Sequence, residues 1–261
     1  MSFVLIDHLG SAVVHLTLNR PDARNALSAD MCNDIVEAFE EIDRNKDARV
    51  VLLSGEGTVF CSGADIGAVS GPGGLEFLPA FERMLETVSH FRLPTVAAIQ
   101  GAALGGGLQL ATVCDFRIAS DGAKIGIPAA RLGIVVNFEN VQRLVMLVGP
   151  PTTKEVLLTA RIFSAQGAKE KNLVTRVVPE GHLVDEAQDY AEAIALSAPL
   201  SVQGAKRAIQ VVLDDMASAR KRNPAEVSEI DTLVSEAYNS SDLAEGLQAF
   251  SEKREPNFRG R

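Results

Sequence analysis

The stretch AIQGAALGGGLQLATVCDFRIAS, residues 98–120, decides the fold. It indicates a strand, a tight turn, a helix and a second strand, and three consecutive glycines, Gly105, Gly106 and Gly107, stand where the helix begins. Glycine destabilises a helix by about 1 kcal/mol relative to alanine. Three in a row therefore predict that something comes very close to the backbone, and we expect that neighbour to be a ligand.

The chain around this stretch alternates short apolar strands with amphipathic helices. The expected elements are a hairpin of residues 3–9 and 12–19, a helix capped by Ser28, a strand at 48–55, a helix at about 75–91, and strands at 95–100 and 116–120. Repeated units of this kind, joined by tight turns, predict an α/β fold with a mainly parallel sheet covered by helices.

The C-terminal part of the chain differs from the rest. Beyond about residue 181 the strand patterns end, and three or four amphipathic helices are expected. Helices of this length with a polar back are marginally stable alone, so they must pack on the core or on another subunit. We expect a core at 1–195 and a C-terminal helical region at 196–261.

The composition excludes several classes of protein. The 261 residues are 46% hydrophobic and 23% charged, with a mean hydropathy of +0.11, as in ordinary globular proteins. A net charge of −9 and a pI near 5.0 argue against binding to nucleic acid or to a membrane surface. The three cysteines are widely spaced and form no CxxC pair, which indicates neither a disulfide framework nor a zinc site and fits a reducing cytoplasm.

One uncharged run, residues 93–114, is long enough to span a bilayer. Because it is rich in Gly, Ala, Thr and Gln and is opened by Pro94, a buried strand, turn and helix is the better interpretation. The start of the sequence lacks the basic flank, apolar stretch and cleavage site of a signal peptide. The expected location is the cytoplasm.

Common catalytic motifs are missing, and two glycine turns remain. The sequence has no GxGxxG register with a later acidic residue, no phosphate loop, no GxSxG elbow and no HExxH, and its histidines are expected to be structural or solvated rather than catalytic. CSGAD (61–65) places Gly63 and Ala64 at a turn, and ALGGGLQL (103–110) places Gly105, Gly106 and Gly107 at a helix start, where free N–H groups favour negative charge. Two amides that converge on one oxygen form an oxyanion hole, which implies a carbonyl that becomes an enolate. The alternative is that each motif is only a structural tight turn.

These motifs resemble those of the crotonase, or enoyl-CoA hydratase/isomerase, family. The matching segments run nearly end to end and are LNRPDARNALS, FCSGADI, IQGAALGGGLQLATVCDFRIAS, LGI, LVG, LTARIFSAQGAKEKNLVTRVV, APLSVQGAKRAI and EKREPNF. The resemblance implies a crotonase-like spiral of β-β-α units with a C-terminal α-helical trimerisation region. It also implies a homotrimer or a dimer of trimers, and an acyl-CoA thioester as ligand, with coenzyme A as part of the substrate and no permanently bound cofactor.

The same resemblance implies which residues bind the ligand. The thioester carbonyl is expected between the backbone amides of Ala64 and Gly106. Arg24 is expected at the phosphates of coenzyme A, and the segment 62–66 at the adenine. The full set of residues expected to bind coenzyme A is Arg24, Ser62, Ala64, Asp65, Ile66, Phe250 and Lys253, the last two reaching the ligand of a neighbouring subunit.

The C-terminal end has a feature that fits this expectation independently. Lys253, Arg254, Arg259 and Arg261 form a basic cluster on an acidic chain, and an anionic ligand could dock there. The alternative is a solvated tail.

Two positions depart from the family's hydratases, which use two glutamates to add water across a double bond. Gln109 and Ala129 stand where the resemblance implies those glutamates. An amide cannot take a proton near neutral pH and alanine has no polar group, so acid and base assistance worth about 10²- to 10⁴-fold is missing. Hydration is therefore the least expected reaction.

A replacement base is available in LGIVVNFENVQRL. The family's isomerases often carry an acid at the position of Asn137, and Glu139 follows two residues later, in the first turn of an expected helix. Glu139 is the candidate proton carrier; alternatively, it is a helix N-terminal charge worth a few tenths of a kcal/mol. Asp65 is closer to the oxyanion motif but is expected to brace its own turn.

Two functions are compatible with these residues. The first is enolate-type isomerisation of an unsaturated fatty acyl-CoA, with Ala64 and Gly106 as oxyanion donors and Glu139 as the base. The second is an acyl-CoA carrier or sensor that keeps the pocket without a catalyst. The candidate pocket residues are apolar and predict a hydrocarbon tail; they are Phe77, Leu78, Phe81, Met84 and Phe138.

Overall fold

The computed structural model describes residues 2–9, 12–65, 67, 74–218 and 224–260. The chain forms two compact units, Met1–Ile125 with Phe163–Val211, and Gly126–Ile162 with Val212–Arg261. Both units combine segments that are far apart in the sequence. The division of the chain at residue 195 follows sequence order instead and stays a prediction.

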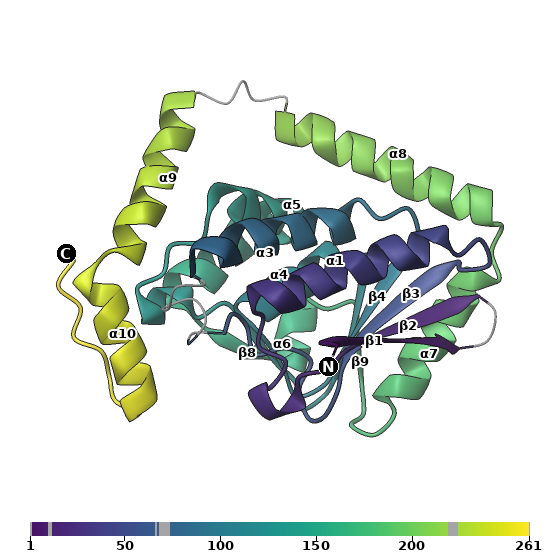
Figure 1. The fold of residues 1–261 in the computed structure, drawn as a ribbon, viewed down its shortest axis with the longest axis horizontal. Helices are drawn as coiled ribbons and strands as arrows, with labels where there is room; N and C mark the ends of the chain where they lie inside the picture. The colour runs from purple at the N-terminus through teal and green to yellow at the C-terminus, as the bar shows by residue number, and fades with distance from the viewer. Residues whose placement is uncertain (1, 10–11, 66, 68–73, 219–223, 261) are drawn as a thin grey trace. The chain divides into compact units, whose positions relative to one another are not determined.

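The first unit is built on a six-stranded sheet with the order β1-β2-β3-β4-β6-β9 (Figure 1). The strands are β1 (Val4–Leu9), β2 (Val13–Leu18), β3 (Val50–Gly55), β4 (Thr95–Ile99), β6 (Phe116–Ser120) and β9 (Arg176–Val178). β1 pairs with β2 as an antiparallel hairpin, and every other pairing in this sheet is parallel. The expected hairpin and mainly parallel sheet are therefore confirmed.

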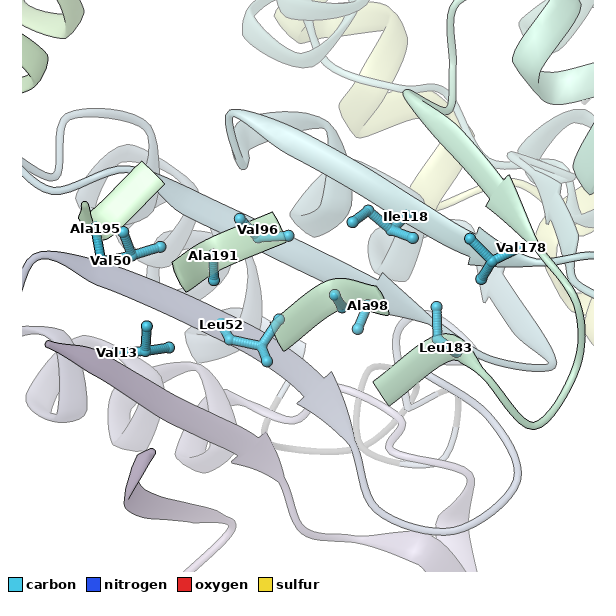
Figure 2. Close-up of a cluster of buried hydrophobic side chains, with 11 residues drawn as sticks. Val13, Val50, Leu52, Val96, Ala98, Ile118, Val178, Leu183, Ala191 and Ala195 are labelled. Atoms are coloured by element: carbon cyan, nitrogen blue, oxygen red, sulfur yellow. The ribbon is translucent and has the colours of Figure 1, made fainter. Parts of the chain in front are cut away.

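Helix α7 (Leu183–Ala195) covers one face of this sheet (Figure 2). Its buried residues recur every fourth position and are Leu183, Ala187, Ala191 and Ala195. Alanine side chains are small, so the helix lies close to the strands, and it packs against Val13, Val50, Leu52, Val96, Ala98, Ile118 and Val178.

The opposite face of the sheet is also buried. Val51 and Leu53 alternate with the side chains under α7, so they point the other way, and both are fully buried. Helices α1 (Ala29–Arg44) and α3 (Gly74–Ser89) lie side by side in this unit (Figure 1). The Ser28 hydroxyl accepts a hydrogen bond from the Met31 N–H at 3.2 Å, which confirms the expected cap of α1.

A second, three-stranded sheet has the order β5-β7-β8. Its strands are β5 (Ala102–Leu104), β7 (Lys124–Gly126) and β8 (Ile162–Ser164). The short helices α4 (Gly106–Val113) and α6 (Ala165–Glu170) belong to the first unit. Strands of three residues are too short to show an alternating pattern, which is why the sequence did not predict this sheet.

The second unit is helical. It contains the 3-10 helix η2 (Ala129–Leu132), α5 (Phe138–Thr159), α9 (Pro224–Tyr238) and α10 (Ser241–Glu252), while α8 (Pro199–Ser218) precedes α9 in the chain. Helix α10 packs closely on η2, since a β-carbon built at Gly246 would lie 2.7 Å from the Leu132 carbonyl. Helices α7 to α10 confirm the expected change to helical structure after residue 181. Within the described ranges, no helix combines the length and apolar character needed to cross a membrane.

Candidate functional site

The turn at residues 61–65 is held on one side by the loop that precedes α1. The Ser62 N–H donates to the Arg24 carbonyl at 3.1 Å. Leu27 then pairs with the turn in both directions: its N–H donates to the Gly63 carbonyl, and its carbonyl accepts from the Asp65 N–H, each at 2.8 Å. The backbone around Ala64 is therefore fixed by hydrogen bonds on both of its neighbours.

The other side of the turn is held by β5. The Cys61 N–H donates to the Ala102 carbonyl at 3.0 Å, and the Cys61 carbonyl accepts from the Leu104 N–H at 3.1 Å. Gly63 has a φ of +108°, and a β-carbon built there would lie 2.9 Å from the Leu104 carbonyl oxygen and 3.5 Å from the Gly106 nitrogen. The turn consequently lies directly against the start of α4.

The glycine run at this helix start is explained in large part by the protein's own backbone. Gly105 has a φ of 52° and a ψ of −120°, a conformation that suits glycine. A β-carbon at Gly107 would lie 2.4 Å from the Cys61 carbonyl oxygen, so the chain itself is the close neighbour there. The expectation that a ligand explains all three glycines is therefore wrong for Gly105 and Gly107. At Gly106 a β-carbon would lie 3.2 Å from the Phe81 ring, a close contact that a small shift of the ring could relieve.

Two backbone N–H groups meet at this point of the fold. In the part of the chain that the structure describes, neither the Ala64 N–H nor the Gly106 N–H donates a hydrogen bond. Gly106 is the first residue of α4, where N–H groups have no partner within the helix and the helix dipole favours negative charge. Two such donors on adjacent backbone segments can stabilise an oxygen that gains negative charge.

Gln109 lies one turn further along α4. Its side-chain oxygen Oε1 is buried and has no hydrogen-bond partner. Its backbone is regular: the N–H donates to the Gly105 carbonyl at 3.1 Å, and the carbonyl accepts from the Thr112 hydroxyl at 2.7 Å. Ala129, the other position at which the resemblance implies a hydratase glutamate, lies in η2 of the second unit.

Glu139 lies in the first turn of α5. The Asn137 side chain caps this helix, since its Oδ1 accepts from the Asn140 N–H at 3.2 Å. A carboxylate here interacts favourably with the helix dipole whatever else it does. Glu139 belongs to the second unit, whereas Ala64 and Gly106 belong to the first.

The loop that carries Arg24 is organised by its neighbour Asn25, which the sequence analysis did not single out. Both residues have a φ of 52°, but Arg24 is exposed and Asn25 is fully buried. The Asn25 carboxamide accepts from the Arg20 N–H at 2.8 Å and donates to the carbonyls of Glu56 and Val59 at 3.0 and 2.9 Å. Asparagine tolerates the left-handed conformation better than most residues, so Asn25 after a turn-forming Pro-Asp pair was the available signal.

Asp65 braces the turn, as expected. One carboxylate oxygen accepts from the Gly67 N–H at 3.1 Å, and the other forms an ion pair with Arg20 at 2.7 Å. Burial raises the pKa of the Cys61 thiol, at the start of the same turn, to about 12, which disfavours the thiolate form. Ile66 lies outside the described residues.

Comparison with known proteins places this arrangement in a family. The enoyl-CoA hydratase/isomerase family model matches residues 8–261. The chain belongs to the enoyl-CoA hydratase/isomerase family. It is 35% identical over 263 residues to the enoyl-CoA isomerase/hydratase fer4 of Mycosarcoma maydis, with 96% of this chain and 94% of that protein covered. It is 33% identical over 271 residues to the enoyl-CoA hydratase EchA19 of Mycobacterium tuberculosis, with 98% and 96% covered.

Solved structures of this family confirm the fold. A methylmalonyl-CoA decarboxylase in complex with 2-nitronate-propionyl-CoA matches with a TM-score of 0.88 and 26% identity over 99% of both chains. The mixed sheets with covering helices, followed by C-terminal helices, are therefore the crotonase-like α/β fold that the resemblance implied.

The C-terminal residues of this family member lie at the end of α10. Phe250 is 59% exposed, and Lys253 ends the helix with a φ of 54°. Of the basic residues expected to cluster here, Arg254 has its guanidinium held by Glu245 at 2.6 and 2.8 Å. The Arg254 side chain in turn holds the pKa of the Glu245 carboxyl at about 2. Arg261 lies outside the described residues.

The backbone after α10 is tied to the same helix. The Asp242 carboxylate accepts from the N–H groups of Arg259 and Gly260, each at 2.7 Å, and Glu245 accepts from the Asn257 N–H at 2.7 Å. The described part of the C-terminal tail is therefore ordered by acidic side chains of α10.

Proposed function

We propose that this chain binds the thioester of an acyl-CoA and stabilises the enolate of its acyl group with the N–H groups of Ala64 and Gly106. The observation that carries the proposal is the pairing of two N–H groups without hydrogen-bond partners on backbone segments that lie against each other. Removing a proton beside a thioester carbonyl moves negative charge onto the carbonyl oxygen. Two preorganised donors aimed at that oxygen lower the barrier, because they require no rearrangement during the reaction.

The reaction that we propose is isomerisation of an unsaturated fatty acyl-CoA, with Glu139 as the proton carrier. Moving a double bond requires the removal of a proton at one carbon and its return at another, and no water is added. One carboxylate can perform both steps. The side chains of Gln109 and Ala129 cannot carry a proton near neutral pH, which disfavours hydration.

The proposed coenzyme A site uses residues around the same turn. Arg24 is exposed next to the segment that includes Ser62 and Asp65, and a guanidinium is suited to bind phosphate. Ile66 completes the segment that we propose to hold the adenine. We propose that Phe250 and Lys253 act on the ligand of a neighbouring subunit in a homotrimer or a dimer of trimers, with coenzyme A bound only as part of the substrate.

A carrier or sensor is the alternative, because stabilising the bound thioester does not require a base. Decarboxylation is a second candidate reaction, and the likeness to methylmalonyl-CoA decarboxylase favours it. When a carboxylate leaves as CO₂, its bonding electron pair forms the enolate. Oxyanion donors can then act without any carboxylate at Gln109 or Ala129.

Exchange in deuterated water tests these possibilities. The protein is incubated with saturated, 2-enoyl and 3-enoyl-CoA of equal chain length, and deuterium incorporation is followed by mass spectrometry. An isomerase should incorporate deuterium at the α or γ carbon and interconvert the two enoyl isomers. Glu139→Gln should slow exchange by about 10²-fold or more while acyl-CoA affinity stays nearly unchanged.

The other outcomes identify the other functions. Micromolar binding of acyl-CoA without deuterium incorporation into any of the acyl chains would establish a carrier. Release of CO₂ from methylmalonyl-CoA without double-bond migration would favour the decarboxylase. Deuterium exchange that persists in Glu139→Gln would support an enzymatic function but would show that Glu139 is not the base.

A further inference from the structure

Strand β1 forms one edge of the six-stranded sheet, so in the described part of the chain it has a neighbouring strand on one side only (Figure 1). Its register with β2 decides which backbone groups face outward. The Asn19 N–H donates to the Phe3 carbonyl at 2.8 Å, so residues 5, 7 and 9 also point their N–H and carbonyl groups toward β2. The backbone groups of Val4, Ile6 and His8 therefore point away from the sheet.

These outward groups differ in whether they already have partners. The Ser2 hydroxyl accepts from the Val4 N–H at 3.3 Å and donates to the Val4 carbonyl at 2.7 Å. Within the residues that the structure describes, the outward N–H and carbonyl groups of Ile6 and His8 have no protein partner. Two donors and two acceptors in a row along an edge are what an added strand pairs with.

A groove of about 570 Å³ lies between this edge and helix α1. The β1 side of the groove is formed by Ser2, Val4, Leu5 and Ile6. The α1 side consists of residues that recur at helical spacing, here called the α1 stripe, and they are Asp34, Glu37, Ala38 and Glu41. Val4 and Ile6 share one face of β1, and every other residue of an added strand would lie on that same face. Such residues would reach the α1 stripe.

The α1 stripe is acidic, since the lining of the groove contains three carboxylates and no lysine or arginine. Asp34 is engaged, because its Oδ2 accepts from the Phe3 N–H at 2.9 Å. Glu37 and Glu41 are exposed, and among the described residues neither carboxylate has a hydrogen-bond or ion-pair partner. The two glutamates are one helical turn apart, a rise of about 6 Å, and alternate residues of a strand are about 6.8 Å apart. Two basic side chains on one face of an added strand therefore match them.

Charge also argues against other occupants of the groove. A second copy of this chain would bring its own β1, with the sequence VLIDHL, to the edge. That strand contains Asp7 and no lysine or arginine, so the glutamates of the α1 stripe would stay unpaired. Nucleic acid and anionic lipid surfaces are repelled by the same carboxylates.

We infer that the edge of β1 and the α1 stripe form a docking surface for an extended basic segment of a partner protein. The segment adds to the sheet as a strand beside Ile6 and His8. Its lysine or arginine side chains, at alternate positions, lie over Glu37 and Glu41. Main-chain hydrogen bonds provide binding, and the carboxylates select for positive charge. The inference does not depend on the proposed acyl-CoA function.

A labelled octapeptide of alternating lysine and valine tests this surface. Fluorescence anisotropy should show that the peptide binds the wild-type protein. Hydrogen exchange resolved to single amides should show slower exchange of the Ile6 and His8 N–H groups in the complex, because the added strand accepts from them. Two control peptides should bind at least about 3-fold more weakly: glutamate in place of lysine reverses the charge, and proline in place of valine removes main-chain donors.

Variants of the protein separate the two parts of the surface. Glu37→Gln combined with Glu41→Gln should weaken peptide binding by about 3- to 10-fold, as two exposed ion pairs allow. Ile6→Pro removes one outward N–H at a position where an edge strand tolerates proline, and it should weaken binding at least as much. The matched control is Asp185→Asn combined with Asp189→Asn, which removes two exposed carboxylates at the same spacing from α7 and should leave the affinity unchanged.

Unchanged exchange of the Ile6 and His8 amides in the peptide complex would overturn the inference, whether or not Ile6→Pro folds. Equal loss of affinity in the two carboxylate variants would also overturn it, because attraction by net charge would then explain binding. Protection of the two amides that grows with protein concentration in the absence of peptide would show that a second copy occupies the edge instead. Failure of the wild-type protein to bind the lysine peptide at millimolar concentration would refute the docking surface.

Discussion

At the residue scale, the geometry of the site depends on one buried side chain, that of Asn25, and on the absence of a side chain at Gly107. Asn25 is fully buried and satisfies three backbone groups from two different segments, which sets the loop that carries Arg24. Gly107 has no room for a side chain, because the Cys61 carbonyl occupies the space. Both residues act through contacts with distant parts of the chain, so neither role follows from helix or turn preference alone.

Gly107→Ala should destabilise the protein by about 1–3 kcal/mol or more, because the added methyl overlaps the Cys61 backbone, which cannot move without disturbing the turn. Urea denaturation measures the free energy of unfolding. The control is Gly204→Ala in α8, where no atom lies within 4 Å of the added carbon. Alanine favours the helix there, so the control should be neutral or stabilising by up to about 1 kcal/mol. Equal stabilities of the two variants would contradict the close contact.

Arg24→Glu should weaken acyl-CoA binding by about 1–3 kcal/mol, since it replaces attraction to phosphate by repulsion. The loss should be larger at low salt, where screening is weaker. Calorimetry at two salt concentrations measures both effects. Lys169→Glu on α6 makes the same change in net charge at an exposed position and should have little effect. If both variants lose affinity equally, the effect comes from net charge and not from a phosphate site at Arg24.

At the element scale, the face that each strand presents decides which polar side chains become buried. Thr17 and Ser54 lie opposite each other on β2 and β3. By the alternation of the strands, their buried side chains are on the same face of the sheet as the residues that α7 covers. His15 lies on the same face of β2, and its Nε2 is 2.7 Å from the Ser54 hydroxyl. That contact gives this histidine a partner within the sheet.

His15 should make the stability of the sheet depend on pH. Burial lowers its pKa below the ordinary value of 6.5, while the nearby Asp7 acts in the opposite direction with a smaller effect. Below the ordinary pKa the unfolded chain therefore binds more protons than the folded chain, and stability falls as the pH falls. Between pH 7 and 5, the free energy of unfolding should decrease more for the wild-type protein than for His15→Gln. Identical pH dependence of the two proteins would contradict this assignment.

At the scale of the whole molecule, apolar side chains remain exposed on α8. Leu200 is 86% exposed and Ile209 is 61% exposed, although both are large hydrophobic residues. A helix with such a face is expected to bury it against a partner. This exposure supports the proposal of a homotrimer or a dimer of trimers, in which the C-terminal helices of one subunit contact another.

Sedimentation velocity should therefore give the mass of three or six chains for the wild-type protein. Ile209→Glu should shift the distribution toward single chains, because a buried unpaired carboxylate is costly at an interface. Ala193→Glu adds the same charge at an exposed position of α7 and should keep the wild-type mass. A wild-type protein that sediments as a single chain at micromolar concentration would refute the assembly.

Much of the fold was predictable because it is encoded in local patterns. The period of apolar residues predicted the hairpin, the parallel strands and the C-terminal helices, and Ser28 predicted the start of α1. The turn at 61–65 and the glycine run at the start of α4 also carry local signals, and the family resemblance singled out Ala64 and Gly106 there as the candidate oxyanion donors. Their assignment as donors remains a prediction.

Other features depend on which distant segments meet, and only the tertiary structure decided them. The three-residue strands β5, β7 and β8 are too short to carry a pattern of their own. Gly107 needs to be glycine because the chain returns past it at Cys61, and Arg254 forms an ion pair because Glu245 lies beside it. The sequence by itself determined the local periods, the caps and the family, since these are properties of neighbouring residues. Close approaches and charge pairs depend on the path of the whole chain, because they form between residues that the sequence separates.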